Sequence, residues 1–119
     1  MNYILVFVGG GLGSILRYLI SSFMSKYNYD FPWATLTANF FATIILGYFL
    51  ALSISGDVSD LKKAMIMTGF CGGFSTFSTF SVENFQMFQQ GQYGYAITNI
   101  LASVIVCLIG AFVGYRLGS

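Results

Sequence analysis

The residues best suited to chemistry lie in one stretch, residues 69–83, which alternates glycine, hydroxyl-bearing and aromatic side chains in an otherwise hydrophobic chain. At helical spacing Phe77 and Phe80 share one face, while Thr79 and Glu83 are four residues apart on a neighbouring face. Because an aromatic ring has a positive edge, ring edges and hydroxyl donors together can hold a small anion without a full positive charge that would trap it. The competing interpretation is that these phenylalanines only pack.

The backbone of the same stretch offers a second kind of chemistry. Gly69, Gly72 and Gly73 each lower helix propensity by about 1 kcal/mol relative to alanine, and the hydroxyl groups that follow can bond freed carbonyls. We therefore predict a break or kink between residues 71 and 76. Freed carbonyl oxygens suit a dehydrated monovalent cation, because no dense carboxylate cluster is present for a divalent one. A glycine hinge without an ion is the alternative.

Three polar residues stand inside apolar segments, and each has two interpretations. Glu83 is either a working acid within the membrane or, being close to the polar residues 86–92, a surface group. Arg17 either faces protein or water, or extends its charge to the membrane surface. Asn39 must find partners for its amide. It serves either as a hydrogen-bonding group between helices or as a donor in a permeation path.

The composition indicates that lipid is the solvent of these residues. Of the 119 residues, 56% are hydrophobic and 8% charged, whereas a soluble domain carries about 25% charged residues. One crossing needs about 20 helical residues, so the length allows four spans and no soluble domain. The net charge of +1 gives no electrostatic case for nucleic acid. We predict an all-α membrane protein, a single four-helix domain over residues 1–119, with spans at residues 3–24, 32–53, 61–88 and 95–117.

The glycines of the first span predict close helix packing. Gly9 and Gly13 are four residues apart. Gly10 and Ser14 repeat this spacing, and small residues so placed let helices approach closely. A dinucleotide-binding turn would need a βαβ unit and a glycine at the sixth position, where Ser14 stands. We therefore expect no nucleotide.

Two of the predicted helices have start signals. Pro32 suits the first turn of the second helix. Asp57 or Ser59 is suited to cap the third helix.

The charged residues give only a small orientation bias. Lys62, Lys63 and Arg116 fall on the amino-terminal side of the membrane. Lys26 falls on the other side, so the bias permits a fixed topology with the amino terminus inside and equally permits insertion both ways round. Since four short helices shield few residues from lipid, we expect an oligomer.

Over essentially its whole length the chain resembles the Fluc (CrcB-type) fluoride channels. The matching features are the length, the four spans, Gly9-Gly10-x-x-Gly13 followed by Arg17-Tyr18, Thr35-Leu36-x-x-Asn39, and the highly specific run Gly69-x-x-Gly72-Gly73-x-Ser75-Thr76-Phe77-Ser78-Thr79-Phe80-Ser81-x-Glu83. The resemblance implies an antiparallel homodimer of dual-topology subunits in the inner (plasma) membrane. It also implies a broken third helix, two pores and a central structural sodium ion (Na+).

The resemblance further implies roles for individual residues. The fluoride pathway would be lined by pore phenylalanines, a pore asparagine and a polar track, namely Phe77, Phe80, Asn39, Ser78, Thr79, Glu83 and Ser103. Gly72 and Ser75 match the positions whose backbone carbonyls hold sodium. Arg17 matches a vestibule or structural arginine of the first helix.

The chain also departs from the family's pattern. Ala34 and Ala42 stand where glycine is expected around the asparagine element. Asn99 stands where many members have a pore-lining tyrosine, so the resemblance assigns it no role.

Together these observations predict passive, fluoride-selective export that lowers cytoplasmic fluoride. We expect no enzyme, because no nucleophile–base pair is apparent. The main rival is a small proton-coupled multidrug exporter, which needs an embedded acid, typically in the first helix. Here that helix carries Arg17, and the candidate acid is Glu83. A structural membrane subunit without transport is a second rival, but it leaves the hydroxyl–aromatic run unexplained.

Overall fold

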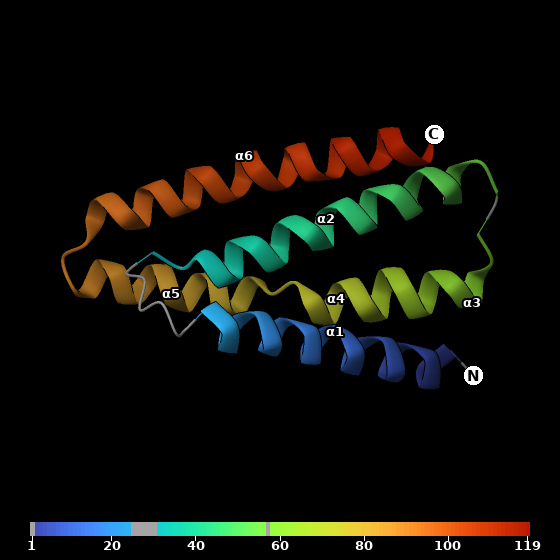
Figure 1. The fold of residues 1–119 in the computed structure, drawn as a ribbon, viewed down its shortest axis with the longest axis horizontal. Helices are drawn as coiled ribbons and strands as arrows, with labels where there is room; N and C mark the ends of the chain where they lie inside the picture. The colour runs from blue at the N-terminus through green and yellow to red at the C-terminus, as the bar shows by residue number, and fades with distance from the viewer. Residues whose placement is uncertain (1, 25–30, 57) are drawn as a thin grey trace.

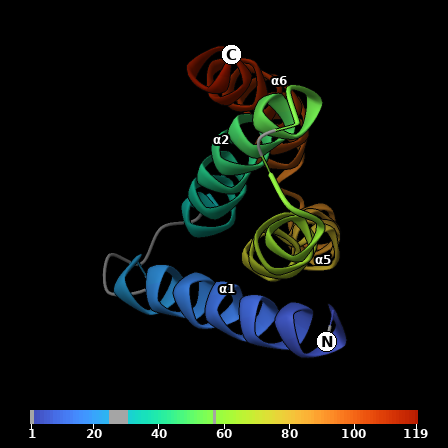
Figure 2. The same ribbon diagram turned by 90° about the vertical axis from the view of Figure 1, so that its right-hand side faces the viewer.

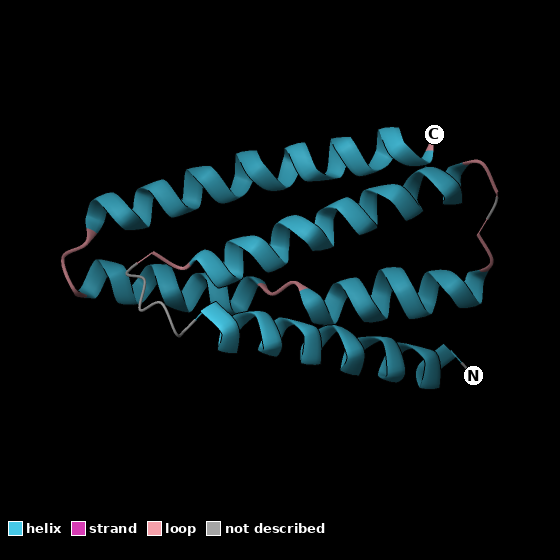
Figure 3. Cartoon of the chain, in the orientation of Figure 1, coloured by secondary structure: helices cyan, strands magenta, loops and turns pink. Residues whose placement is uncertain are grey.

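The computed structural model describes residues 2–24, 31–56 and 58–119, and these residues form helices joined by short turns (Figures 1 and 3). Helix α1 spans Asn2–Met24, α2 spans Trp33–Ile54 and α6 spans Tyr93–Gly118. The segment between α2 and α6 is built of pieces: α3 (Asp60–Lys62), the π-helix η2 (Lys63–Cys71), α4 (Gly72–Phe74) and α5 (Phe77–Gln89). The protein is therefore all-helical over the described residues, in agreement with the predicted fold class.

Among the described residues, three helices are long and apolar enough to cross a membrane, namely α1, α2 and α6. Each lies within two residues of a predicted span at both ends. The third predicted span, residues 61–88, corresponds to α3 through α5 and is interrupted after Phe74. The continuous apolar helices thus surround a segment whose composition is more polar.

The helices lie in layers, with α6 beside α2 and the α3–α5 segment between α2 and α1 (Figures 1 and 2). Helix α2 packs along α6, whereas α1 packs on η2 and α4. Both chain ends and α3 lie at the same end of the bundle (Figure 1). Lys62 of α3 and Arg116 in the last turn of α6 are accordingly on the amino-terminal side, as predicted, and Lys26 lies outside the described residues.

The contact between α1 and the η2–α4 segment is made backbone to backbone. A Cβ atom on Gly9 would collide with the Met65 carbonyl, and one on Gly13 would collide with the Phe70 carbonyl. From the other side, a Cβ on Gly73 would collide with the Gly10 carbonyl. The close approach predicted from the spacing of Gly9 and Gly13 is confirmed.

The contact between α2 and α6 is also made at glycines that lie against the backbone of the other helix. The sequence analysis did not identify this contact. A Cβ on Gly47 would meet the Ala111 carbonyl, and a Cβ on Gly114 would meet the Ile44 carbonyl. Gly110 and Gly118, four residues before and after Gly114, are also closely approached from α2. This four-residue spacing in α6 was the available signal.

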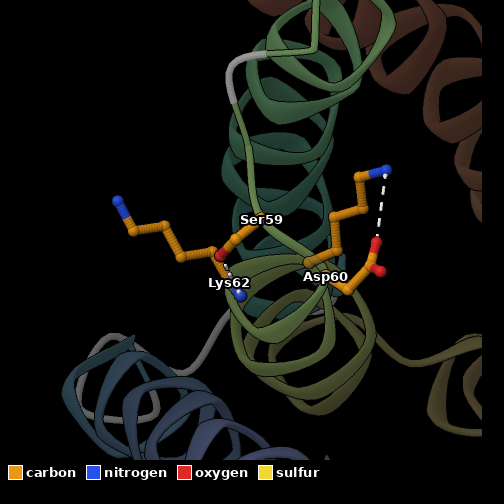
Figure 4. Close-up of polar contacts among 4 residues, drawn as sticks. Ser59, Asp60 and Lys62 are labelled. Atoms are coloured by element: carbon orange, nitrogen blue, oxygen red, sulfur yellow. Dashed lines mark hydrogen bonds and ion pairs between the residues drawn. The ribbon is translucent and has the colours of Figure 1, made fainter.

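The ends of two elements match the start signals, with one shift. The Ser59 side chain accepts a hydrogen bond of 3.3 Å from the Lys62 backbone N–H, so Ser59 is the N-cap of α3, as predicted (Figure 4). Asp57, the other candidate, lies outside the described residues. The surface ion pair Lys63–Asp60 spans 4.0 Å (Figure 4). Pro32 precedes α2 as its N-cap residue instead of lying in its first turn.

Candidate functional site

The interruption of the third segment is two residues long. Ser75 and Thr76 have extended backbones, with ψ of 152° and 123°. The Ser75 N–H and hydroxyl both donate to the Cys71 carbonyl, at 3.0 and 2.8 Å. The Thr76 hydroxyl then accepts from the Thr79 N–H and caps α5. Local hydroxyl groups therefore satisfy the backbone on both sides of the interruption.

Asn39 of α2, outside the third segment, pairs with a backbone N–H of the interruption. Its Oδ1 accepts a 3.1 Å hydrogen bond from the Thr76 N–H. That N–H would otherwise donate to the Gly72 carbonyl, four residues earlier, so the Gly72 oxygen loses its helical donor. Because the amide oxygen of Asn39 faces Thr76, its amide nitrogen remains available as a donor. One side chain thus supports the backbone and supplies a hydrogen-bond donor.

A pocket of about 300 Å³ opens beside the interruption, between α2, α5 and α6. Four of the predicted pathway residues line it together, namely Asn39, Phe77, Phe80 and Ser103, and they are joined by Thr43, Ser75, Thr76, Val104 and Cys107. We call it the aromatic groove. Its walls combine an amide, hydroxyl groups and two rings, which is the donor set predicted for a small anion.

The two phenylalanines of the groove lie next to each other. The ring centroids of Phe77 and Phe80 are 5.7 Å apart, and the rings are tilted by 43°. Phe77 is 78% exposed on the single chain. A ring so placed must be covered by lipid or by protein from outside the chain.

Two further predicted pathway residues, Thr79 and Glu83, line a second pocket together with the predicted vestibule or structural residue Arg17. This pocket of about 230 Å³ lies between α1, α2 and α5. Ser14 of α1 and Thr35 of α2 contribute further hydroxyl groups. We call it the charged pocket, because Arg17 of α1 and Glu83 of α5 both line it.

Glu83 stands at the boundary between two pockets. It lines the charged pocket and also a pocket of about 220 Å³ with Gln86, Gln90 and Gln92. Within the described parts of the chain, its Oε1 is the one buried side-chain oxygen or nitrogen without a hydrogen-bond partner. The Thr35 side chain faces the carboxyl group. A buried acceptor without a donor is costly, so this oxygen is suited to a proton or a donor supplied by solvent.

Two predicted site residues lie outside both pockets. Ser78 is exposed, and its hydroxyl lies 3.0 Å from the Thr76 hydroxyl. Gly72 is also exposed, and a Cβ added there would meet nothing within 4 Å. Its freed carbonyl and that of Ser75 are neutral oxygen ligands, and the space beside Gly72 is open. This chemistry fits a monovalent cation such as sodium.

A buried amide pair joins α5 to α6. Nδ2 of Asn99 donates a 2.8 Å hydrogen bond to Oδ1 of Asn84, and Oδ1 of Asn99 accepts a 3.2 Å bond from the Ser103 hydroxyl. Asn99 is 1% exposed and Asn84 is 6% exposed. Asn84 lies seven residues after Phe77 and so on the same face of α5, but the sequence analysis did not identify it as a site residue.

Ala42 and Ala34, which stand where glycine was expected, lie in the core and at the charged pocket. Ala42 is buried against Phe74 in the core, together with Ala38. Its methyl group therefore fills space beside the end of α4. Ala34 lines the charged pocket.

The chain was compared with known proteins. The family model described as CrcB-like protein, Camphor Resistance (CrcB), matches residues 4–115. A protein of Pyrococcus abyssi is 44% identical over 115 residues, covering 96% of this chain and 93% of its own. Relatives from Thermus thermophilus and Rhodospirillum rubrum are each 38% identical, covering 98% and 97% of this chain and 93% and 92% of their own. All three relatives are named fluoride-specific ion channel FluC.

Proposed function

The chain belongs to the CrcB-like family, and on that premise we propose that it is a fluoride-selective ion channel that spans the membrane several times. The observation that carries the proposal is the aromatic groove, which gathers the Asn39 amide, the rings of Phe77 and Phe80 and the Ser103 hydroxyl. Its relatives are named for fluoride conduction. The protein is accordingly an ion channel and not an enzyme.

The groove fits the physical demands of fluoride. Fluoride is small and strongly hydrated, so its lost water must be replaced by many donors. Amide and hydroxyl groups supply such donors, and ring edges add partial positive charge. No lysine or arginine is among the described residues that line the groove, so binding stays weak enough for release, and a narrow path excludes larger chloride.

The pathway continues from the aromatic groove along α5 to the charged pocket. Thr79 and Glu83 lie on the same helix as Phe80, and Arg17 of α1 lines the pocket with them. Arg17 raises the local concentration of anions at this end. Flux through such a pathway is passive, and the membrane potential drives export that lowers cytoplasmic fluoride. Export of fluoride from the cytoplasm places the channel in the cell inner membrane.

A second copy of the chain completes the channel. The exposed ring of Phe77 and the open space around Gly72 indicate that one chain leaves the site uncovered. An antiparallel homodimer with dual-topology subunits places two such grooves in one assembly, which gives two pores. The weak charge bias of the sequence is compatible with both insertion directions.

A sodium ion at the centre of that dimer would be held by the backbone carbonyls of Gly72 and Ser75. The freed carbonyl of Gly72 and its exposure support this assignment. A bound cation would neutralise carbonyl dipoles at membrane depth and so stabilise the interruption. The chain itself holds Ser75 and Thr76 in their extended conformation through the hydrogen bonds of the Ser75 and Asn39 side chains.

The rival function, a proton-coupled multidrug exporter, receives less support. Such an exporter needs an acid facing a cavity large enough for an organic cation. Glu83 lines pockets of about 230 and 220 Å³, and Arg17 shares the larger one. A guanidinium group beside the acid opposes a cationic substrate.

The test is fluoride release from proteoliposomes. Purified protein is reconstituted into vesicles loaded with potassium fluoride, and valinomycin is added to carry the compensating potassium. A fluoride electrode follows the release, and vesicles loaded with potassium chloride are run in parallel. We expect rapid release of fluoride without release of chloride.

The controls are protein-free vesicles of the same lipid and vesicles that carry an unrelated membrane protein, both loaded with potassium fluoride. Release of both anions would reject selectivity. An absence of release from correctly inserted protein would reject the channel, and proton-coupled uptake of organic cations with Glu83→Gln would then be measured.

A further inference from the structure

Helix α5 is attached to the rest of the bundle by few contacts. Its main helix partner is α6. At its amino-terminal end the Thr76 N–H is held by Asn39 of α2. Further along, Asn84 is hydrogen-bonded to Asn99 of α6. Amide side chains from α2 and α6 therefore both contribute to holding the helix that carries Phe77 and Phe80.

The position of Asn84 on α5 gives its hydrogen bond a directional effect. Residues at i, i+3 and i+7 share one face of a helix. Phe77, Phe80 and Asn84 have this spacing. The two rings line a groove that α6 also lines, and Asn84 bonds to α6 directly. The bond at Asn84 therefore fixes the rotation of α5 about its axis, and this rotation sets where the two rings point.

Burial makes this bond hard to exchange for bonds to water. Asn99 is 1% exposed and Asn84 6% exposed. Removing one amide leaves the other buried without its partner, whereas replacing both with apolar groups of similar shape leaves no unpaired amide. The Ser103 hydroxyl, which then loses Asn99 as its acceptor, can donate to a backbone carbonyl of its own helix. The pair therefore has a diagnostic property: each single replacement is worse than the double replacement.

We propose that the Asn84 and Asn99 side chains form a positioning pair that sets the rotation of α5, and thereby the anion selectivity of the aromatic groove. This rests on the proposed fluoride function. Neither amide touches the anion. The pair acts through Phe77 and Phe80, which it holds toward α6, and Ser103 extends it to the groove wall by donating to Asn99.

The experiment compares Asn84→Leu, Asn99→Leu and the double variant in the proteoliposome assay. The readout is the ratio of chloride to fluoride flux, which does not depend on how much of the protein is active. We expect the ratio to rise about fivefold or more in each single variant, the size of effect expected for one unpaired buried amide. In the double variant we expect the ratio to return most of the way to wild type.

Gln89→Leu is the matched control, because it makes the same chemical change at an exposed position of α5. It should leave the ratio unchanged. If the single variants lose total flux but keep the wild-type ratio, the pair only stabilises the fold, and the positioning proposal is wrong. Single variants no worse than the double variant would also overturn it.

Hydrogen exchange separates this proposal from the proposed function. In detergent, each single variant should speed amide exchange in α5 about tenfold while α1 and η2 keep their protection. If the wild type releases no fluoride, the proposed channel function is wrong. Amide exchange in α5 then still tests whether the Asn84–Asn99 pair attaches this helix. Unchanged exchange in α5 would reject the pair as the attachment of this helix.

Discussion

The two halves of the third segment are held in opposite ways. Before the interruption, η2 and α4 lie against α1 with backbone touching backbone, at Gly9, Gly13 and Gly73. After it, α5 lies against α6 and is linked to it through a side-chain hydrogen bond between two amides. The first half has no spare space where it meets α1, whereas the second half is positioned by side chains that can be replaced by others.

This difference explains where the polar side chains gather. A contact between backbones leaves no room for a pathway, and its glycines supply no donors. A contact made by side chains leaves pockets, and the aromatic groove and the charged pocket both include residues of α5. The interruption at Ser75 and Thr76 is the point at which the segment changes partner.

The largest effect is expected from adding a methyl group at the contact between α1 and the first half. Gly9→Ala would place a Cβ against the Met65 carbonyl, and a backbone cannot move aside as a flexible side chain can. We expect a loss of about 3 kcal/mol, the upper end for overpacking, or failure to assemble. The readout is the yield and melting temperature of purified protein.

Gly11→Ala is its control, because a Cβ there meets nothing within 4 Å. Both changes raise helix propensity equally. If the two variants behave alike, the contact between backbones is not essential and the comparison fails.

The second largest effect is expected from a change in the second half, and it should appear in fluoride flux and not in assembly. Phe80→Ile should abolish or severely reduce fluoride flux, by about tenfold or more if the ring-edge contribution is about 1.4 kcal/mol. Assembly should be unaffected because the ring borders the groove. Size-exclusion chromatography and the fluoride electrode measure the two properties.

Phe85→Ile makes the same substitution on α5 at a position that is 60% exposed. Its flux should match the wild type. Normal flux from a well-assembled Phe80→Ile variant would remove the ring from the pathway.

The junction between the halves should show an intermediate effect. Asn39→Leu removes the acceptor of the Thr76 N–H, and an unpaired buried donor costs about 1–3 kcal/mol. Thr43→Val is the control, since its hydroxyl lines the same groove but bonds to the Phe40 carbonyl of its own helix. Melting temperatures should fall clearly for the first variant and little for the second. Equal shifts would mean that Asn39 does not support the interruption.

The smallest effect is expected at the start of α5. Thr76→Ala removes the side-chain cap that accepts from Thr79, which costs about 1 kcal/mol. Thr76→Ser keeps the hydroxyl and should restore the melting temperature. Failure of serine to restore it would assign the loss to the threonine methyl group.

Much of the fold follows from the sequence because its causes are local or periodic. Apolar runs gave the long helices to within two residues, and the four-residue spacing of Gly9 and Gly13 gave the contact with the third segment. Ser59 was identified as a candidate cap from its chemistry alone. These features depend on residues close together in the chain.

The site was less predictable because it depends on pairs that are distant in sequence. Asn84 and Asn99 are on different helices, and no periodicity indicates that two amides will meet. The separation of Thr79 from Phe80 into different pockets depends on the rotation of α5 after two extended residues. Helical spacing on α5 predicted their separate faces but not which neighbour each face would meet.

The hydrogen bond between Asn39 and Thr76 also bears on how the chain is made. A backbone N–H left unpaired in hydrocarbon costs several kcal/mol, and the acceptor for Thr76 comes from α2. Helix α2 precedes the third segment in the chain, so the ribosome delivers the acceptor before the group that needs it. The third segment therefore reaches its final form in the bilayer only beside a helix already inserted, and the order of synthesis supplies that helix first.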